Sequence, residues 1–224
     1  MSTLSAREAY RRWAPEYERE TAISTLENLT IAEMGIHTAG RALLDAGCGT
    51  ARRLRETGAE PAIGIDVSID MLGHAPRSTA LAVGDLRAIP LAAEQFDVVW
   101  CRLAIGHVRD IGQAYLELAR VCRVRGVVVV TDVSPDAATS GHRRTFRDSD
   151  GATHEVEHFV HSMTTHMSAA ARAGLSLIDR RDGLCGPSVR QFYVDAGRSR
   201  AYDEQLGTPL VLALSWRKFR STEG

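Results

Sequence analysis

Short apolar runs alternate with helix-compatible segments through the middle of the chain. The runs occupy residues 42–45, 62–66, 80–83, 96–101 and 127–131. The clearest helix between them is expected at 111–124, where apolar positions recur on one face before Arg125-Gly126. Alternation of this kind is typical of parallel strands that are buried on both faces. We predict an α/β fold, a Rossmann-like, doubly wound and mostly parallel sheet of seven strands.

The remaining parts of the chain have different patterns. Residues 1–38 are expected to form a helical lid that is broken at Pro15, and 39–132 the core. Residues 133–170 form a polar segment that becomes helical near its end, which predicts an insertion that caps the substrate. Residues 171–224 should supply the C-terminal strands, the last of them antiparallel at the edge of the sheet. The whole chain is thus predicted to be one domain.

Composition narrows the classes of function. The chain has 224 residues, 27 Lys plus Arg and 28 Asp plus Glu, so its net charge of −1 offers no general attraction to nucleic acid or acidic membranes. No apolar run approaches the roughly 20 residues that cross a bilayer. The first residues contain no apolar core typical of a signal peptide, so we expect a cytoplasmic protein with reduced thiols. Its four cysteines include no Cys-x-x-Cys pair, and no metal site is predicted.

A glycine turn follows the first core strand. Gly47 and Gly49 lie where a ligand can approach the backbone closely. The third glycine of a dinucleotide fingerprint is replaced by Arg52, which counts against an NAD-dependent reductase. Asp45 precedes the glycines and would repel a phosphate but suit a cation. The turn therefore predicts a ligand with positive charge and no phosphate.

Two more carboxylates follow later strands. Asp66 closes the second core strand, where it could accept hydrogen bonds from ribose hydroxyls, and Asp85 follows the third, where it could meet an adenine amino group. Each could instead be an ordinary helix cap. Their common placement with one glycine turn favours a nucleoside ligand.

The motifs at these positions resemble a known family. They read LLDAGCGT at 43–50, GIDVS at 64–68, GDL at 84–86 and FDVV at 96–99, and they resemble the motifs of class I S-adenosyl-L-methionine-dependent methyltransferases. The resemblance covers about 40–132. One departure is visible at 123–127, RVRGV, where the family commonly carries a proline and two glycines; this changes a turn but not the cofactor site. Beyond 132 the chain is similar to the small-molecule branch, which includes quinone and natural-product methyltransferases.

The resemblance implies a cofactor, S-adenosylmethionine, with S-adenosylhomocysteine as its product. It implies that Asp45 and the glycine turn surround the methionine part, that Asp66 binds the ribose, and that Cys101 and Arg102 lie beside the sulfonium. Tyr17 would belong to an aromatic lid with Tyr10 and Trp13, or would simply pack. The residues expected to bind the cofactor are Tyr17, Asp45, Ala46, Gly47, Gly49, Asp66, Val67, Met71, Gly84, Asp85, Leu86, Cys101 and Arg102.

Histidines are the candidates for a general base, which is needed only if the acceptor is a poor nucleophile. His107 follows the fourth core strand, and its alternative role is packing or capping. His158 and His161 lie in the part similar to the family's substrate region. With His154 they would share one face of a helix. That face could belong to a substrate pocket, a solvated surface or a metal site. We take His107, His158 and His161 as the catalytic candidates.

The sequence therefore predicts methyl transfer to a small organic acceptor, such as a secondary metabolite or a quinone-like molecule, by in-line displacement, with a histidine as general base if the acceptor needs one. Arg143, Arg144 and Arg147 could steer an anionic acceptor or form a solvated face. The alternative is a protein that binds S-adenosylmethionine for a cyclisation, a rearrangement or a structural purpose. Macromolecular methylation is disfavoured because no nucleic-acid module or basic stripe is present. No nucleic-acid or membrane partner is expected, and two copies could associate as a homodimer.

Overall fold

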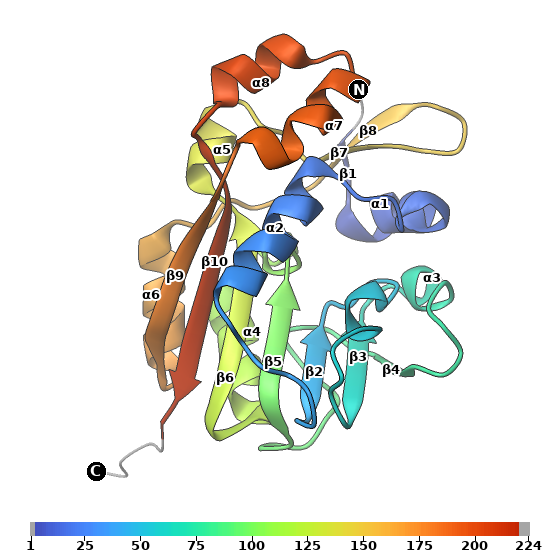
Figure 1. Ribbon diagram of the computed structural model, residues 1–224. Helices are drawn as coiled ribbons and strands as arrows, with labels where there is room; N and C mark the ends of the chain where they lie inside the picture. The colour runs from blue at the N-terminus through green and yellow to red at the C-terminus, as the bar shows by residue number, and fades with distance from the viewer. Residues whose placement is uncertain (1–2, 220–224) are drawn as a thin grey trace.

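The predicted seven-stranded sheet is the centre of the fold. The computed structural model describes residues 3–219 and orders the strands β4-β3-β2-β5-β6-β10-β9 (Figure 1). The bounds are Leu43–Ala46 for β2, Ala62–Asp66 for β3, Ala80–Val83 for β4, Phe96–Arg102 for β5, Cys122–Val133 for β6, Leu175–Leu184 for β9 and Pro209–Lys218 for β10. β2 to β6 pair in parallel, and β10 is antiparallel to both β6 and β9. The mostly parallel Rossmann-like fold is confirmed.

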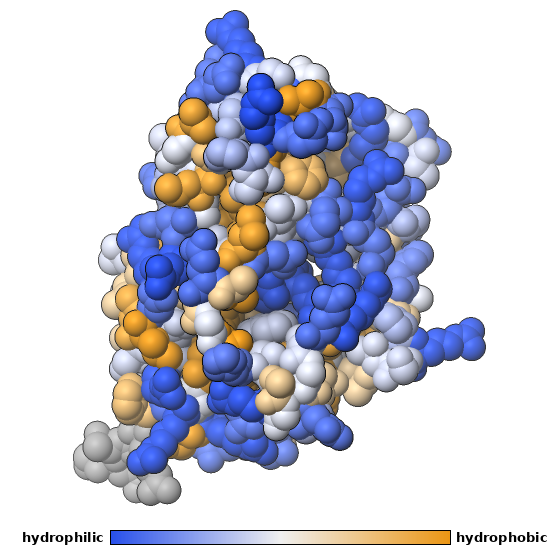
Figure 2. Space-filling view, in the orientation of Figure 1, coloured by the Kyte–Doolittle hydropathy of each residue, from blue (hydrophilic) through white to orange (hydrophobic). Residues whose placement is uncertain are grey.

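The edge of the sheet differs from the prediction. β9 is the edge strand, because β10 lies between β6 and β9. Side chains 210–216 are all buried, as expected for an inner strand. β9 exposes Leu177 and Ile178, and Figure 2 shows apolar residues on that side of the molecule. Ion pairs join Arg180 to Asp182 and Arg181 to Asp179 on the same strand, and such charges discourage pairing with another chain.

Helices cover both faces of the sheet. α4 (Ile111–Val121) and α6 (Met163–Arg172) pack on the face that contains Leu44, whereas α2 (Ala22–Glu33) lies over the opposite face, in front in Figure 1. The helix predicted at 111–124 ends earlier because β6 already begins at Cys122. Within residues 3–219, no helix combines the length and apolar character that crossing a membrane requires.

The connections around β3 are shorter than the sequence pattern suggests. The helix-compatible segment after the glycine turn forms only a single 3-10 turn, Arg52–Leu54, and α3 is only Ile69–Leu72. Gly58 has a positive φ and Pro61 follows shortly after, so the first of these segments ends before a longer helix can form.

The lid has the predicted helices and an unpredicted strand. α1 (Ala6–Trp13) is followed by a 3-10 turn, Ala14–Glu16, that contains Pro15, and then by α2. β1 (Thr3–Leu4) joins β8 (Thr153–Val156) and β7 (Thr145–Arg147) in a small second sheet. Two helices between β9 and β10 were also not predicted, namely α7 (Arg190–Asp195) and α8 (Ser199–Gln205).

The cap, residues 133–170, contains α5 (Pro135–Thr139), the strands β7 and β8, an extended segment and most of α6. Residues 157–162 between β8 and α6 form no helix. The prediction that His154, His158 and His161 share a helical face is therefore wrong. His154 belongs to β8, where the pairing with β7 sets the direction of its side chain. His158 and His161 lie in the extended segment that follows.

Candidate active site

The glycine turn adopts a conformation that requires glycine. Gly47 has φ +83° and Gly49 has φ +58°, both in the left-handed region. A Cβ atom on Gly47 would lie 2.4 Å from the Cβ atom of Ala104. At Gly49 the nearest neighbours would be Met71 Cε at 3.0 Å and Tyr17 at 3.4 Å. The turn thus lies directly under the lid residue Tyr17, at the carboxyl end of β2.

Replacing Gly47 by alanine should destabilise the protein by about 2 to 4 kcal/mol, because left-handed strain and steric overlap add. Gly35→Ala is the matched control, since Gly35 also has a positive φ but meets no atom within 4 Å. We expect that control to lose about 1 kcal/mol. Urea unfolding of both variants measures the difference, and equal losses would refute the close approach to Ala104.

Asp45 is a buried carboxylate without a partner. Its side chain is 1% exposed, and neither oxygen has a hydrogen-bond partner. Burial raises its pKa to about 6, although Arg53 and Arg102 act in the opposite direction. An unpartnered carboxylate of this kind is suited to a cationic group. The ammonium and sulfonium of S-adenosylmethionine have the charge that fits it.

Asp66 is oriented by the backbone. Its two carboxylate oxygens accept hydrogen bonds from the N–H groups of Gly49 and Ser68, both at 2.8 Å. Burial raises the pKa of this carboxyl despite those bonds. The bonds hold Asp66 against the glycine turn, and its oxygens have further lone pairs for ligand hydroxyls.

The third predicted carboxylate, Asp85, already accepts hydrogen bonds from Arg87. Arg87 donates to Asp85 from its side chain, at 2.6 Å and 3.0 Å, and from its backbone at 2.8 Å. These contacts with Arg87 lower the pKa of Asp85. An amino group of a ligand would have to share Asp85 with Arg87, a partner that the sequence analysis missed although it lies two residues away.

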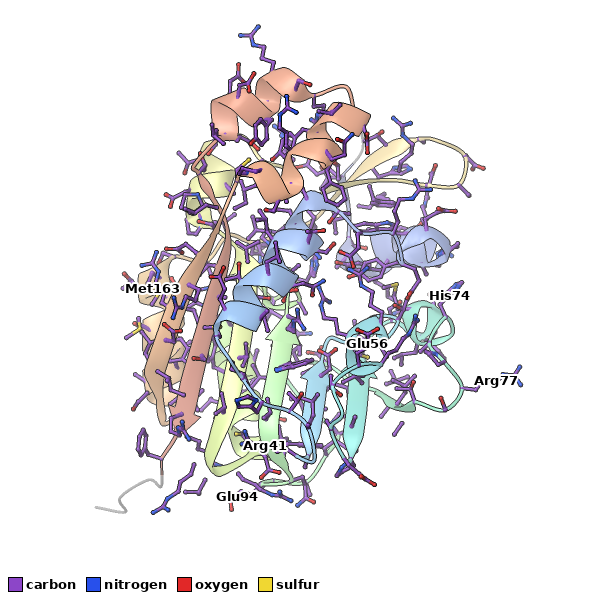
Figure 3. The ribbon with its side chains drawn as sticks, viewed as in Figure 1. Arg41, Glu56, His74, Arg77, Glu94 and Met163 are labelled. Atoms are coloured by element: carbon purple, nitrogen blue, oxygen red, sulfur yellow. The ribbon has the colours of Figure 1, made fainter. Side chains whose placement is uncertain are left out.

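The other predicted cofactor residues divide into exposed and buried groups. Val67 is 56% exposed, whereas Met71, Leu86 and Ala46 are buried. A Cβ atom on Gly84 would lie 2.7 Å from Pro90. Figure 3 shows His74 and Arg77 around α3, with Arg77 directed away from the sheet. The β3 and β4 side of the site is therefore the more open one.

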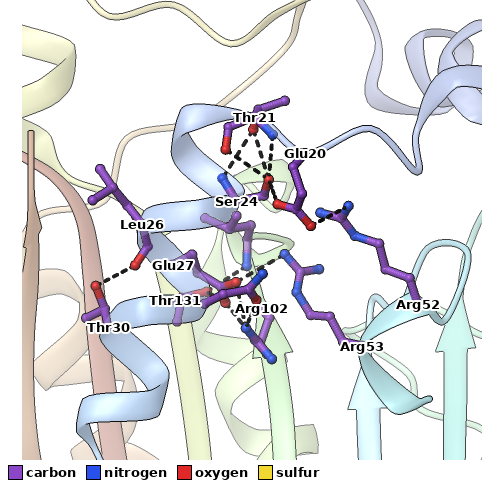
Figure 4. A network of polar contacts seen from close by, with 12 residues as sticks. Glu20, Thr21, Ser24, Leu26, Glu27, Thr30, Arg52, Arg53, Arg102 and Thr131 are labelled. Atoms are coloured by element: carbon purple, nitrogen blue, oxygen red, sulfur yellow. Dashed lines mark hydrogen bonds and ion pairs between the residues drawn. The ribbon is translucent and has the colours of Figure 1, made fainter. Parts of the chain in front are cut away.

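Cys101 and Arg102 are both enclosed by protein atoms at the end of β5. Cys101 lies in the hydrophobic core, and burial raises the pKa of its thiol. The guanidinium of Arg102 donates to both oxygens of Glu27 on α2, each at 2.7 Å (Figure 4). The side chain of Arg102 is thus engaged with the lid helix, and its predicted place beside the sulfonium stays untested.

A large cavity lies beyond the carboxyl ends of β5 and β6. Its volume is about 1080 Å³, and its wall includes Leu103 and Val133 from those strand ends, Trp13 and Tyr17 from the lid, and Tyr193 from α7. Arginines dominate its polar lining: Arg19, Arg52, Arg53, Arg143, Arg144, Arg147 and Arg198. The lining carboxylates are Glu20 and Asp195. Seven arginines against two carboxylates make the cavity strongly basic in a chain of net charge −1.

None of the three candidate catalytic histidines lines this cavity. His107 Nδ1 lies 3.0 Å from the carbonyl of Glu157, and its Nε2 lies 2.9 Å from the hydroxyl of Tyr10. His158 Nε2 lies 3.2 Å from Asp132, and His161 Nε2 lies 2.9 Å from the carbonyl of Val108. These bonds fasten residues 157–161 to the loop after β5 and to the end of β6, so the geometry does not support any of these three histidines as a base at the cavity.

Several residues of the cavity were not found from the sequence. His142 lines it, and burial lowers the pKa of this histidine to about 4, so it is neutral near pH 7. Arg53, which follows the glycine turn, and Arg198, which lies in no motif, were also missed. The sequence analysis did identify Arg143, Arg144 and Arg147 as a basic cluster, and all three line the cavity. Among residues 3–219, no group of three or more His, Cys, Asp and Glu side chains is arranged to hold a metal ion.

Comparisons with known proteins relate the chain to methyltransferases. Residues 44–130 match the family described as "Methyltransferase domain". A malonyl-[acyl-carrier protein] O-methyltransferase from Dechloromonas aromatica is 32% identical over 182 residues, which cover 80% of this chain and 68% of that protein. Relatives of the same name from Pseudescherichia vulneris and Enterobacter lignolyticus are matched over 56% and 53% of their length, so the chain spans little more than half of them.

Solved structures share the fold. An S-adenosylmethionine-dependent methyltransferase from Mesorhizobium loti superposes with a TM-score of 0.67 at 20% identity, covering 88% of this chain and all (100%) of that one. The geranyl diphosphate C-methyltransferase of Streptomyces coelicolor, in complex with Mg²⁺, geranyl diphosphate and S-adenosyl-L-homocysteine, gives 0.64 at 16% identity and covers 88% and 79%. The chain belongs to the class I S-adenosylmethionine-dependent methyltransferases, and S-adenosylmethionine is its cofactor.

Proposed function

We propose that this enzyme methylates a carboxylate oxygen of a small acyl acceptor and forms a methyl ester. The observation that carries the proposal is the cavity lining, which has seven arginines and two carboxylates, with His142 neutral. A positive lining favours an anionic acceptor and disfavours a neutral quinone. The relatives named malonyl-[acyl-carrier protein] O-methyltransferases support a malonyl thioester as the acceptor.

Four of the seven arginines already have carboxylate partners. Arg53 pairs with Glu27 at 3.2 Å, Arg52 with Glu20 at 3.0 Å, Arg143 with Glu155 at 3.1 Å and Arg19 with Glu16 at 3.9 Å. Arg144, Arg147 and Arg198 pair with no carboxylate of residues 3–219. These three guanidiniums are the proposed partners of the acceptor's carboxylate.

A carboxylate acceptor needs no general base, which fits a cavity wall that lacks the three predicted histidines and in which burial lowers the pKa of His142 to about 4. Carboxyl groups ionise near pH 4, so at neutral pH the nucleophilic oxygen carries no proton to remove. When bound, S-adenosylmethionine supplies an activated methyl group and leaves as the neutral thioether S-adenosylhomocysteine. The chain's own residues have to orient the acceptor and exclude water. Trp13, Tyr17 and Phe146 give the cavity the apolar walls for that exclusion.

The proposal is tested with S-adenosylmethionine that carries a radioactive methyl group. Malonyl thioester on acyl carrier protein is the acceptor, and acetyl thioester on the same carrier is the matched control without a carboxylate. We expect label in the malonyl product only, and its release as methanol on mild base treatment, which identifies an ester. Label that appears with a neutral quinol acceptor, or that resists base, would contradict the proposal.

A further inference from the structure

A chain of hydrogen bonds connects the lid, the loop after β5 and the cap at the wall of the cavity. It runs from Arg144 to Tyr10 and on to His107 and the carbonyl of Glu157. We infer that Tyr10 and His107 are positioning residues that hold the guanidinium of Arg144 in place to bind the acceptor's carboxylate. This inference rests on the proposed function for the identity of the acceptor, but the chain itself can be tested separately.

The direction of each hydrogen bond follows from the groups involved. A carbonyl oxygen only accepts, so the proton at the contact with Glu157 must be on Nδ1 of His107. In a neutral imidazole, Nε2 is then an acceptor, and the hydroxyl of Tyr10 must donate to it across 2.9 Å. A guanidinium only donates, so Arg144 Nη2 donates to the oxygen of Tyr10 across 2.7 Å. Only in this arrangement does each of the three contacts join one donor to one acceptor.

The surroundings keep His107 in the neutral state that this arrangement needs. Burial, with the positive charge of Arg144 and the neighbouring His158, lowers the pKa of His107 well below its ordinary value of 6.5. The carbonyl of Glu157 acts in the opposite direction. Tyr10 also keeps its proton near pH 7, because burial raises its pKa. His107 therefore acts as a fixed acceptor for Tyr10, and its basic nitrogen is not available to a substrate.

Arg144 remains able to bind an anion after these contacts. Its Nη1 donates to the carbonyl of Leu103 at 3.0 Å and its Nη2 to Tyr10, which leaves other N–H groups of the guanidinium unused. The two acceptors are neutral, so they orient Arg144 without cancelling its charge. A long side chain that is already ordered loses less conformational entropy on binding. Leu103 also lines the cavity, so Arg144 is held at the carboxyl end of β5.

The kinetic test compares variants along the chain with malonyl thioester on acyl carrier protein. Arg144→Gln should raise the acceptor KM about 100-fold, and Tyr10→Phe, which removes one orienting hydroxyl, about 10-fold. His107→Gln retains an amide oxygen that can accept from Tyr10 and should be milder than His107→Phe. In all four, the affinity for S-adenosylhomocysteine should change less than about twofold, as expected for groups that act on the acceptor only. Arg180→Gln, on the edge strand β9, is the control arginine.

The second arm measures the tautomer of His107 by long-range ¹H–¹⁵N NMR in complex with S-adenosylhomocysteine. We expect the Nδ1–H tautomer between pH 6 and 8, and a shift of the Nε2 signal toward that of an unbonded nitrogen in Tyr10→Phe. An Nε2–H tautomer in the wild type, or an unchanged KM for Tyr10→Phe beside a large loss for Arg144→Gln, would overturn the inference. A wild type that methylates no carboxylate would overturn the proposed function instead, and the NMR result would still decide the arrangement of the chain.

Discussion

Replacing Glu27 by glutamine is expected to destabilise the protein by about 3 to 5 kcal/mol, because it leaves two buried guanidiniums without their carboxylate. Glu27 is 0% exposed on α2. It accepts two hydrogen bonds from Arg102, one from Arg53 at 3.2 Å and one from Thr131 at 2.9 Å (Figure 4). The side chains of both arginines are also largely buried, at 6% and 7% exposure. Removing one member of such a cluster leaves the other buried charges without a partner.

The same cluster predicts a pH dependence. Burial alone would raise the pKa of Glu27, but the charges of Arg53 and Arg102 lower it to about 2. A folded-state pKa below the ordinary 4.5 means that the stabilisation is present above pH 4.5 and is lost as the pH falls toward 2. In Glu27→Gln this part of the acid destabilisation should be absent.

Urea unfolding at pH 7 and at several lower pH values measures both effects. Glu204→Gln is the matched control, because Glu204 pairs with Arg200 on the exposed surface of α8 and surface pairs contribute little. A Glu27→Gln protein that keeps wild-type stability at pH 7 would refute the role of the cluster. The cluster also joins the lid to the glycine turn, since Glu27 is on α2 and Arg53 follows the turn.

The core of the sheet could be predicted because each buried parallel strand is a short continuous apolar run in the sequence. β2, β3 and β5 are short apolar runs, and each is covered on both faces. The helices α7 and α8 could not be found in this way. α7 has no buried residue and α8 buries only Tyr202, so neither shows the apolar periodicity of a packed helix. The strands β1 and β7 are too short for a pattern to be visible.

The candidate site shows the same division between local and long-range information. Gly47, Gly49 and Asp66 lie within one strand–turn–strand unit, and motif spacing was enough to bring them together. Glu27 is 26 residues from Arg53 and 75 from Arg102, so no local pattern marks it as their partner. His107 was found from its place after a strand, but its role depends on Tyr10, 97 residues away. The hydrogen-bond direction and the tautomer of His107 can be assigned only when such contacts are known.

Replacing Asp45 by asparagine is expected to weaken cofactor binding and to stabilise the unliganded protein. The carboxylate is buried without a hydrogen-bond partner, so its charge is costly until a cation approaches. We expect the affinity for S-adenosylhomocysteine to fall about 10- to 100-fold, the usual range for a lost charge-assisted hydrogen bond. A larger loss for S-adenosylmethionine than for S-adenosylhomocysteine would indicate that Asp45 faces the sulfonium, and equal losses that it faces the ammonium.

The effect on stability has the opposite sign. Burial raises the pKa of Asp45 from 3.8 to about 6, so the folded state binds the proton more tightly than the unfolded state. The free energy of unfolding therefore falls as the pH rises from about 4 to about 6, by roughly 3 kcal/mol. Asp45→Asn removes this loss, and at pH 7 the unliganded variant should gain up to that amount, less the cost of its buried amide.

Calorimetric titration with both cofactor forms, and urea unfolding at pH 5 and pH 7 without them, measure the two effects. Asp70→Asn makes the same chemical change at an exposed position of α3 and serves as the control. An Asp45→Asn protein that binds both cofactor forms normally, or that is less stable than wild type at pH 7, would show that the carboxylate is compensated by the protein itself. The expected opposition of affinity and stability means instead that the site holds an unfavourable charge which only the cofactor's cation relieves.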